Sequence, residues 1–154
     1  AKELGFDDKR LFVTGHSSGG HLGGCILVTD WAKDFGLRPD LLKGAVLLSG
    51  MYEMAPVALS KRSKFVNFTP ETIEQLSAIR RLDFVRCPVV LGYGTNESPE
   101  FQRQTREFAA ALAAAGKPHE LIVAQGVNHF EMLEGLHNPY GPFGRAALRL
   151  FTAS

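Results

Sequence analysis

The sequence has few cysteines, almost no net charge and no long apolar run. Its two cysteines, Cys25 and Cys87, stand far apart in apolar stretches, so they match no zinc or CxxC spacing and are expected to be buried thiols. The 17 basic and 16 acidic residues nearly balance, which argues against a nucleic-acid or anionic-membrane partner. No apolar stretch approaches the roughly 18 residues that a membrane-spanning helix needs.

What is present fits one globular domain of 154 residues, with a hydrophobic fraction of 45%. Four short apolar runs predict buried strands: Leu11–Thr14, Gly44–Gly50, Pro88–Tyr93 and His119–Ala124. Helices are predicted between and after them, from Ser18 to about Phe35, over Thr69–Ile79, from Ser98 to about Ala115 and over Phe143–Phe151. This alternation predicts an α/β fold with a mostly parallel sheet flanked by helices.

The periodicity also predicts which face of each helix is buried. In the first helix the expected inner residues are Leu22, Cys25, Ile26 and Thr29, with Gly36 as the stop. In the helix that starts at Ser98 they are Phe101, Thr105, Phe108, Leu112 and Ala115, with Gly116 and Pro118 ending it. Ser98 as N-cap and Pro99 at the first helical position make this start well defined.

The segment Gly15-His16-Ser17-Ser18-Gly19 matches the pattern G-x-S-x-G, between a predicted strand and a predicted helix. A nucleophile must be exposed and held still, and a tight strand-to-helix turn does both. Glycines two residues to either side of the serine are expected to avoid steric conflict there. We therefore predict Ser17 as the nucleophile. The backbone N–H of Ser18, at the helix N-terminus, is the predicted oxyanion-hole donor.

A serine nucleophile needs a base, and His129 is the predicted one among five histidines. His129 follows the last predicted strand, and active residues of α/β folds lie at the carboxyl ends of strands. His16 lies inside the turn itself, and His21 is expected to be structural. His119 is expected at the surface, and His137 in a loop without a clear partner.

The base needs a carboxylate to orient it, and two glutamates follow strand ends. Glu97 comes after the third predicted strand and Glu53 after the second. The residues alone favour Glu97 and leave Glu53 open. The non-catalytic alternatives are a helix-capping carboxylate for Glu97 and a solvated loop charge for Glu53.

The segments "GHSSGGHL", "LLSGMYEM", "ESPEFQRQTREF" and "GVNHFEML" together resemble the arylformamidase (kynurenine formamidase)-like branch of the α/β-hydrolase superfamily, close to the hormone-sensitive-lipase type of esterase. The resemblance implies Ser17 as nucleophile, the Ser18 amide as oxyanion donor and His129 as base. It also implies Glu97, directly before "SPEF", as the triad acid. The acid is often Asp in this branch, so Glu97 is a departure from its pattern.

A larger departure is that no HGGxW-type motif occurs, although the branch carries one before its nucleophile turn to supply further oxyanion-hole amides. Residues 1–154 are therefore expected to be the C-terminal part of a single α/β-hydrolase domain. The strand before Ser17 would have an unpaired, aggregation-prone edge. We expect the chain to need an N-terminal half from elsewhere, or to assemble with a second chain, with a homo-oligomer as one form of this.

These observations predict a serine hydrolase that cleaves small carboxylic esters or aryl formamides through an acyl-enzyme intermediate, with no metal or organic cofactor. The alternative is a non-catalytic α/β-hydrolase-like binding or structural module, which the missing oxyanion motif would suit. The expected partner is a small-molecule ester or amide, with no nucleic acid and no membrane. A cytoplasmic location is expected from the resemblance and the sparse cysteines. The segment 51–68 is expected to line or cover the substrate pocket.

Overall fold

The computed structural model describes residues 5–153 and contains a parallel sheet in the order β1-β2-β3-β4. The strands are β1 (Leu11–His16), β2 (Leu42–Leu48), β3 (Val89–Gly94) and β4 (His119–Ala124). All three pairings are parallel, as continuous apolar runs and long crossover connections predict. The expectation of an α/β fold with a mostly parallel, helix-flanked sheet is confirmed.

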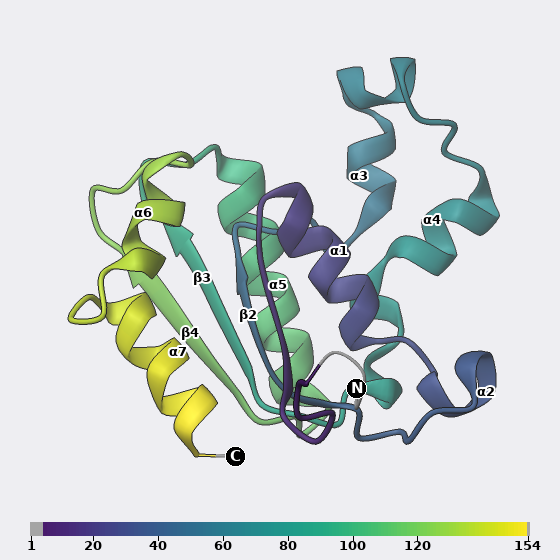
Figure 1. Ribbon diagram of the computed structural model, residues 1–154. Coiled ribbons are helices and arrows are strands. Elements are labelled where there is room, and N and C mark those ends of the chain that lie inside the picture. The colour runs from purple at the N-terminus through teal and green to yellow at the C-terminus, as the bar shows by residue number, and fades with distance from the viewer. Residues whose placement is uncertain (1–4, 154) are drawn as a thin grey trace.

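Helices cover both faces of the sheet (Figure 1). The α-helices are α1 (Ser18–Leu27), α2 (Trp31–Phe35), α3 (Met54–Ala58), α4 (Pro70–Leu76), α5 (Pro99–Ala114), α6 (Glu131–His137) and α7 (Pro142–Thr152). Short 3-10 helices are η1 (Lys61–Lys64), η2 (Ala78–Arg80) and η3 (Leu82–Phe84). The chain between β2 and β3 contains α3, η1 and α4, and this segment projects away from the sheet at the upper right of Figure 1.

Alternate residues of the central strands feed two cores. Ala45 and Leu47 of β2 join Phe108 and Leu112 of α5 in one cluster, which lies under α1 and α5. On the other face, Val46 and Leu48 of the same strand pack with residues of α6 and α7, including Met132, Phe143 and Ala147. This period-two division of a strand that is buried from Gly44 to Leu48 is what fixes the register of the sheet.

The first helix differs from the sequence prediction in length and in buried face. Helix α1 ends at Leu27, and Asp30 then caps the separate helix α2 by accepting a hydrogen bond from the Lys33 N–H. The buried residues of α1 are Gly20, Gly23, Gly24 and Leu27, whereas Leu22 is 60% exposed. The glycines allow α1 to lie close to the sheet, so backbone proximity and not large side chains selects the inner face.

Helix α5 starts and ends as predicted, with Ser98 at the N-cap, Pro99 as its first residue and Gly116 in the left-handed conformation after its end. Of its predicted inner residues, Phe101 is only half-buried, and Ala115, the C-cap, is exposed because it lies beyond the last helical residue. Its buried residues are Gln104, Thr105, Phe108, Ala109 and Leu112. Gln104 was not predicted. Its side-chain oxygen accepts hydrogen bonds from the backbone N–H groups of Tyr52 and Glu53, at 2.6 and 2.8 Å, and so fixes the chain just after β2.

No helix in residues 5–153 combines the length and the apolar character needed to cross a bilayer.

Candidate active site

Ser17 occupies a sharp turn between β1 and α1. Its backbone has φ 58° and ψ −118°, a conformation that side-chain-bearing residues rarely adopt. Such strain costs on the order of 1–3 kcal/mol and persists only where the surroundings enforce it. Here the Ser17 N–H donates to the carbonyl of Leu48 at 3.0 Å, which ties the turn to the end of β2.

The hydroxyl of Ser17 faces a histidine and does not cap its helix. Serine at an N-cap usually accepts a hydrogen bond from the first helical turn, but the side chain of Ser17 makes no such bond. Instead its Oγ lies 2.8 Å from Nε2 of His129. The amides of the first turn of α1, beginning with Ser18, lack intrahelical acceptors and add partial positive charge beside this hydroxyl.

The glycines around the turn are not equivalent. A Cβ on Gly15 would lie 2.1 Å from the carbonyl oxygen of Gly19, so only glycine fits at this position. A Cβ on Gly19 would meet nothing within 4 Å among the residues described, contrary to the expectation that both flanking glycines are sterically required. The next residue, Gly20, is the confined one, because its Cβ would lie 2.9 Å from the Leu48 oxygen.

Glu97 lies in the loop between β3 and α5, with its side chain completely buried. One carboxylate oxygen is 2.5 Å from Nδ1 of His129. The other accepts hydrogen bonds from the Ser49 hydroxyl and the Gly94 N–H, both at 2.8 Å. Both oxygens of this buried carboxylate are therefore satisfied, as a buried charge requires.

Ser49 is a site residue that the sequence reasoning missed. It follows β2, is fully buried and has φ 51°, the second non-glycine residue with a positive φ among those described. Its N–H donates to the carbonyl of Gly92 at 2.8 Å, while its hydroxyl holds Glu97. A serine directly after a buried strand was the available signal, but a strand end alone does not reveal which carboxylate its hydroxyl meets.

Glu53, the other carboxylate that the sequence left open, is used in the framework. It caps α3 by accepting from the Ala55 N–H, and it pairs with Arg80 at 2.7 Å. Burial alone would raise the pKa of Glu53, but hydrogen bonds from Arg80 and the Ala55 N–H outweigh it and lower that pKa. The structure thus brings Glu97, and not Glu53, to the candidate histidine.

His129 lies in the loop after β4, and the rings of His16, Phe101 and Phe130 lie around its imidazole. Phe101 of α5 stacks on it with centroids 4.3 Å apart and planes at 26°. The ring of His16 lies 4.6 Å away, tilted by 42°. Burial, and then the neighbouring His129, lower the pKa of His16, which favours its neutral form. Nε2 of His16 is buried and has no hydrogen-bond partner within residues 5–153.

The remaining histidines and cysteines lie outside this arrangement. His21 of α1 contacts the carbonyl of Leu76 at 3.0 Å and the sulfur of Cys25 at 3.4 Å. His119 begins β4, and His137 ends helix α6, where a loop was expected. Cys87 is buried, and burial raises the pKa of its thiol to about 11. Cys25 is only half-buried, so the expectation of two buried thiols is correct for Cys87 alone.

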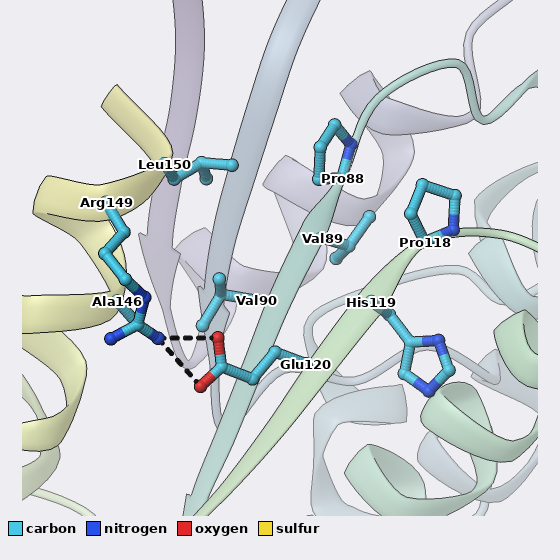
Figure 2. A pocket seen from close by; sticks show the side chains of 9 residues that line it. All are labelled: Pro88, Val89, Val90, Pro118, His119, Glu120, Ala146, Arg149 and Leu150. Atoms are coloured by element: carbon cyan, nitrogen blue, oxygen red, sulfur yellow. Dashed lines mark hydrogen bonds and ion pairs between the residues drawn. The ribbon is translucent and has the colours of Figure 1, made fainter. Parts of the chain in front are cut away.

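A separate open pocket of about 290 Å³ lies at the other end of the strands, where β3 and β4 begin. Figure 2 shows the ion pair between Glu120 and Arg149 that crosses it, with a 2.9 Å contact. It lies at the amino ends of these strands, whereas Ser17, Glu97 and His129 follow strand carboxyl ends. Within residues 5–153 no three His, Cys, Asp or Glu side chains gather closely enough to hold a metal ion.

The chain is similar in sequence and in fold to several known proteins. No family model matches the chain. It is 31% identical to a kynurenine formamidase of Danio rerio over 131 residues, which is 82% of this chain and 44% of that protein. It is 21% identical to the isoprenylcysteine alpha-carbonyl methylesterase ICME of Arabidopsis thaliana, with 84% of this chain and 35% of that protein covered. The chain thus spans less than half the length of these relatives.

Among solved structures, a puromycin hydrolase mutant in complex with PGG superposes with a TM-score of 0.75 at 23% identity. That match covers 99% of this chain and 23% of the hydrolase chain. At this identity the likeness concerns the fold alone, a parallel sheet flanked by helices. Together with the sequence relatives it shows that this chain, over the part it covers, has the fold of α/β-hydrolases and is similar in sequence to hydrolases.

Proposed function

We propose that the chain carries the Ser17–His129–Glu97 triad of a serine hydrolase that cleaves small carboxylic esters or aryl formamides. The observation that carries this proposal is the continuous hydrogen-bonded series from the Ser17 hydroxyl through both ring nitrogens of His129 to Glu97. The names of its relatives, a formamidase and a methylesterase, support a carbonyl substrate with an amide or ester leaving group.

In the proposed reaction, Nε2 of His129 takes the proton of Ser17 as Oγ attacks the carbonyl carbon. The tetrahedral intermediate collapses when His129 returns that proton to the leaving nitrogen or oxygen and the bond to the leaving group breaks. Water, deprotonated by His129, then attacks the acyl carbon, the bond to Oγ breaks, and Oγ regains a proton. Glu97 stays ionised throughout and stabilises the positively charged imidazole.

The oxyanion would be stabilised by the Ser18 N–H, at the positive end of α1. One donor is fewer than such sites commonly use. We propose that a segment of the gene product outside this chain supplies a second donor and also pairs with the free edge of β1. In support, β1 has β2 as its one strand neighbour in the described sheet. Its residues are half-buried or, at Thr14, exposed, whereas all residues of β3 are buried.

The test is Ser17→Ala in the complete gene product, with Ser18→Ala as the matched control. Ser18 contributes its backbone in this mechanism, so its substitution should leave turnover within about tenfold, whereas Ser17→Ala should lower it by about 10³-fold or more. A fluorophosphonate probe should label the unsubstituted protein and fail to label Ser17→Ala. A folded protein that is not labelled and cleaves neither short aryl esters nor aryl formamides would support a non-catalytic binding module instead.

A further inference from the structure

A pocket of about 160 Å³ lies between the projecting segment and the start of α5. This pocket, the Arg62 pocket, is lined by Met51, Pro56, Val57, Ser60, Arg62, Ser98, Glu100 and Phe101. Its walls therefore come from the chain after β2, from α3 and η1, and from the first turn of α5. None of these residues belongs to the proposed triad.

The Arg62 pocket adjoins the candidate active site through two residues. Phe101 lines the pocket, and its ring is also the one stacked on His129. Ser98 lines it as well and directly follows Glu97 in the chain. Phe101 is thus shared by the pocket and the candidate active site, so a group bound in the pocket would contact the ring that stacks on His129.

The size and walls of the pocket fit one flat apolar ring. Met51 and Val57 are buried, and with Met54 they form an apolar cluster against which Phe101 packs. A cavity of about 150 Å³ with apolar walls is enough to bind benzene. The aromatic side chain of Phe101 also favours an aromatic occupant, because offset aromatic pairs add to the gain from burial.

The charge that lines the pocket is unbalanced. Glu100 is neutralised, because Arg103 pairs with it at 2.7 Å and the Gln104 amide donates to it at 3.0 Å. Arg62, in contrast, forms no ion pair with any residue in the described range 5–153. A guanidinium group without a partner beside a ring-sized apolar pocket is complementary to a carboxylate carried on that ring.

We propose that the Arg62 pocket binds an aromatic group of the substrate that carries a carboxylate, and that Arg62 makes the enzyme select such substrates over neutral ones of the same shape. This inference rests on the proposed function, since it concerns the substrate of that same site. It assigns a specificity role to a residue outside the triad.

The experiment compares two esters of equal shape, 4-acetoxybenzoate and 4-acetoxybenzamide, with the complete gene product. The unsubstituted protein should cleave the charged ester with the higher kcat/KM. Arg62→Gln should lower kcat/KM for the benzoate about fivefold, the size expected of one exposed charge pair, and leave that for the benzamide within twofold. Lys64→Gln is the matched control: Lys64 lies in the same 3-10 helix but does not line the pocket, so the preference should persist.

A binding measurement separates failure of this inference from failure of the proposed function. Calorimetry of the Ser17→Ala protein with 4-hydroxybenzoate and 4-hydroxybenzamide needs no turnover. Tighter binding of the benzoate that Arg62→Gln abolishes and Lys64→Gln retains would support the pocket even if neither ester is cleaved. Equal binding of the two compounds, or equal losses in Arg62→Gln and Lys64→Gln, would overturn it, since the latter would indicate a general field of the basic segment.

Discussion

Ser17 and Ser49 are the two residues with a side chain that the described structure holds at positive φ. They follow neighbouring parallel strands, β1 and β2, and each hydroxyl contacts a different member of the same hydrogen-bonded series. Positive φ at a non-glycine residue is unfavourable, and it concentrates where function requires a side chain in an unusual direction. The two strained serines thus mark the site independently of the motif around Ser17.

His16 makes acid stability testable at the residue level. Burial lowers its pKa in the native state, so between that lowered pKa and the ordinary value near 6.5 the unfolded chain binds more protons than the native one. Stability must then fall as the pH falls through this range. We expect the melting temperature of the complete gene product to drop less between pH 7.5 and 5.5 in His16→Gln than in the unsubstituted protein.

His137→Gln is the control for this comparison, because His137 is exposed at the end of α6. It should leave the drop in melting temperature as in the unsubstituted protein. If His16→Gln and the unsubstituted protein lose stability in parallel, the His16 ring is protonated in the native state at these pH values and the assignment of a neutral ring fails.

The sequence was sufficient to predict which residues meet at the site and insufficient to predict what holds them. Ser17, Glu97 and His129 could be placed because parallel strands bring the residues after them to one edge. Ser49 could not, because its contact with Glu97 depends on a backbone twist that no pattern encodes. The residues alone favoured Glu97 but left Glu53 open, and it is a tertiary contact, the pairing of Glu53 with Arg80, that assigns Glu53 to the framework.

At the scale of elements, α1 shows why a hydrophobic stripe can mislead. The predicted inner face carried Leu22, yet the face that meets the sheet is built of glycines. A Cβ on Gly20 would lie 2.9 Å from the backbone oxygen of Leu48, so the close approach of helix and strand disfavours larger residues there. Periodicity of large apolar residues finds helices that pack through side chains and misses helices that pack through backbone.

The turn that joins β1 to α1 gives a prediction with an internal control. Gly15→Ala forces a Cβ against the backbone of Gly19, which cannot yield as a side chain can, so we expect a loss of about 3 kcal/mol or more in the free energy of unfolding. Gly19→Ala meets open space within the described chain and replaces a helical glycine, so the change should stay within about 1 kcal/mol.

Urea unfolding of both variants in the complete gene product measures this difference. An equal loss in the free energy of unfolding for the two substitutions would contradict the steric difference between Gly15 and Gly19.

At the scale of the whole molecule, the sheet is covered unevenly. Strand β3 is buried throughout and lies between two neighbours, whereas β1 has one neighbour and its residues Leu11, Phe12 and Val13 are half-buried. An apolar strand with an open edge offers unpaired N–H and C=O groups to other chains. The apolar runs in the sequence predicted the four strands. Whether the edge of β1 is covered depends on the chain that pairs with it, which periodicity does not reveal.

We therefore expect residues 1–154, expressed alone, to form oligomers or aggregates, while the complete gene product stays dispersed. Light scattering coupled to size-exclusion chromatography checks this over a range of concentrations. A monodisperse monomer of 16.8 kDa that unfolds cooperatively would contradict the proposal that β1 pairs with a further segment.

The segment that lines the Arg62 pocket is separate from the strands that carry the proposed triad. The residues proposed for chemistry follow β1, β3 and β4, while the segment from α3 to η1 contributes Pro56, Val57, Ser60 and Arg62 to the Arg62 pocket. The start of the segment is fixed by Gln104, whose side-chain oxygen accepts a hydrogen bond from the Glu53 N–H. Its two ends are joined by the hydrogen bond from the Met54 N–H to the Ser77 hydroxyl. The stretch between these anchors can therefore differ in sequence or length, and so reshape the Arg62 pocket, without displacing the hydrogen-bonded series of Ser17, His129 and Glu97.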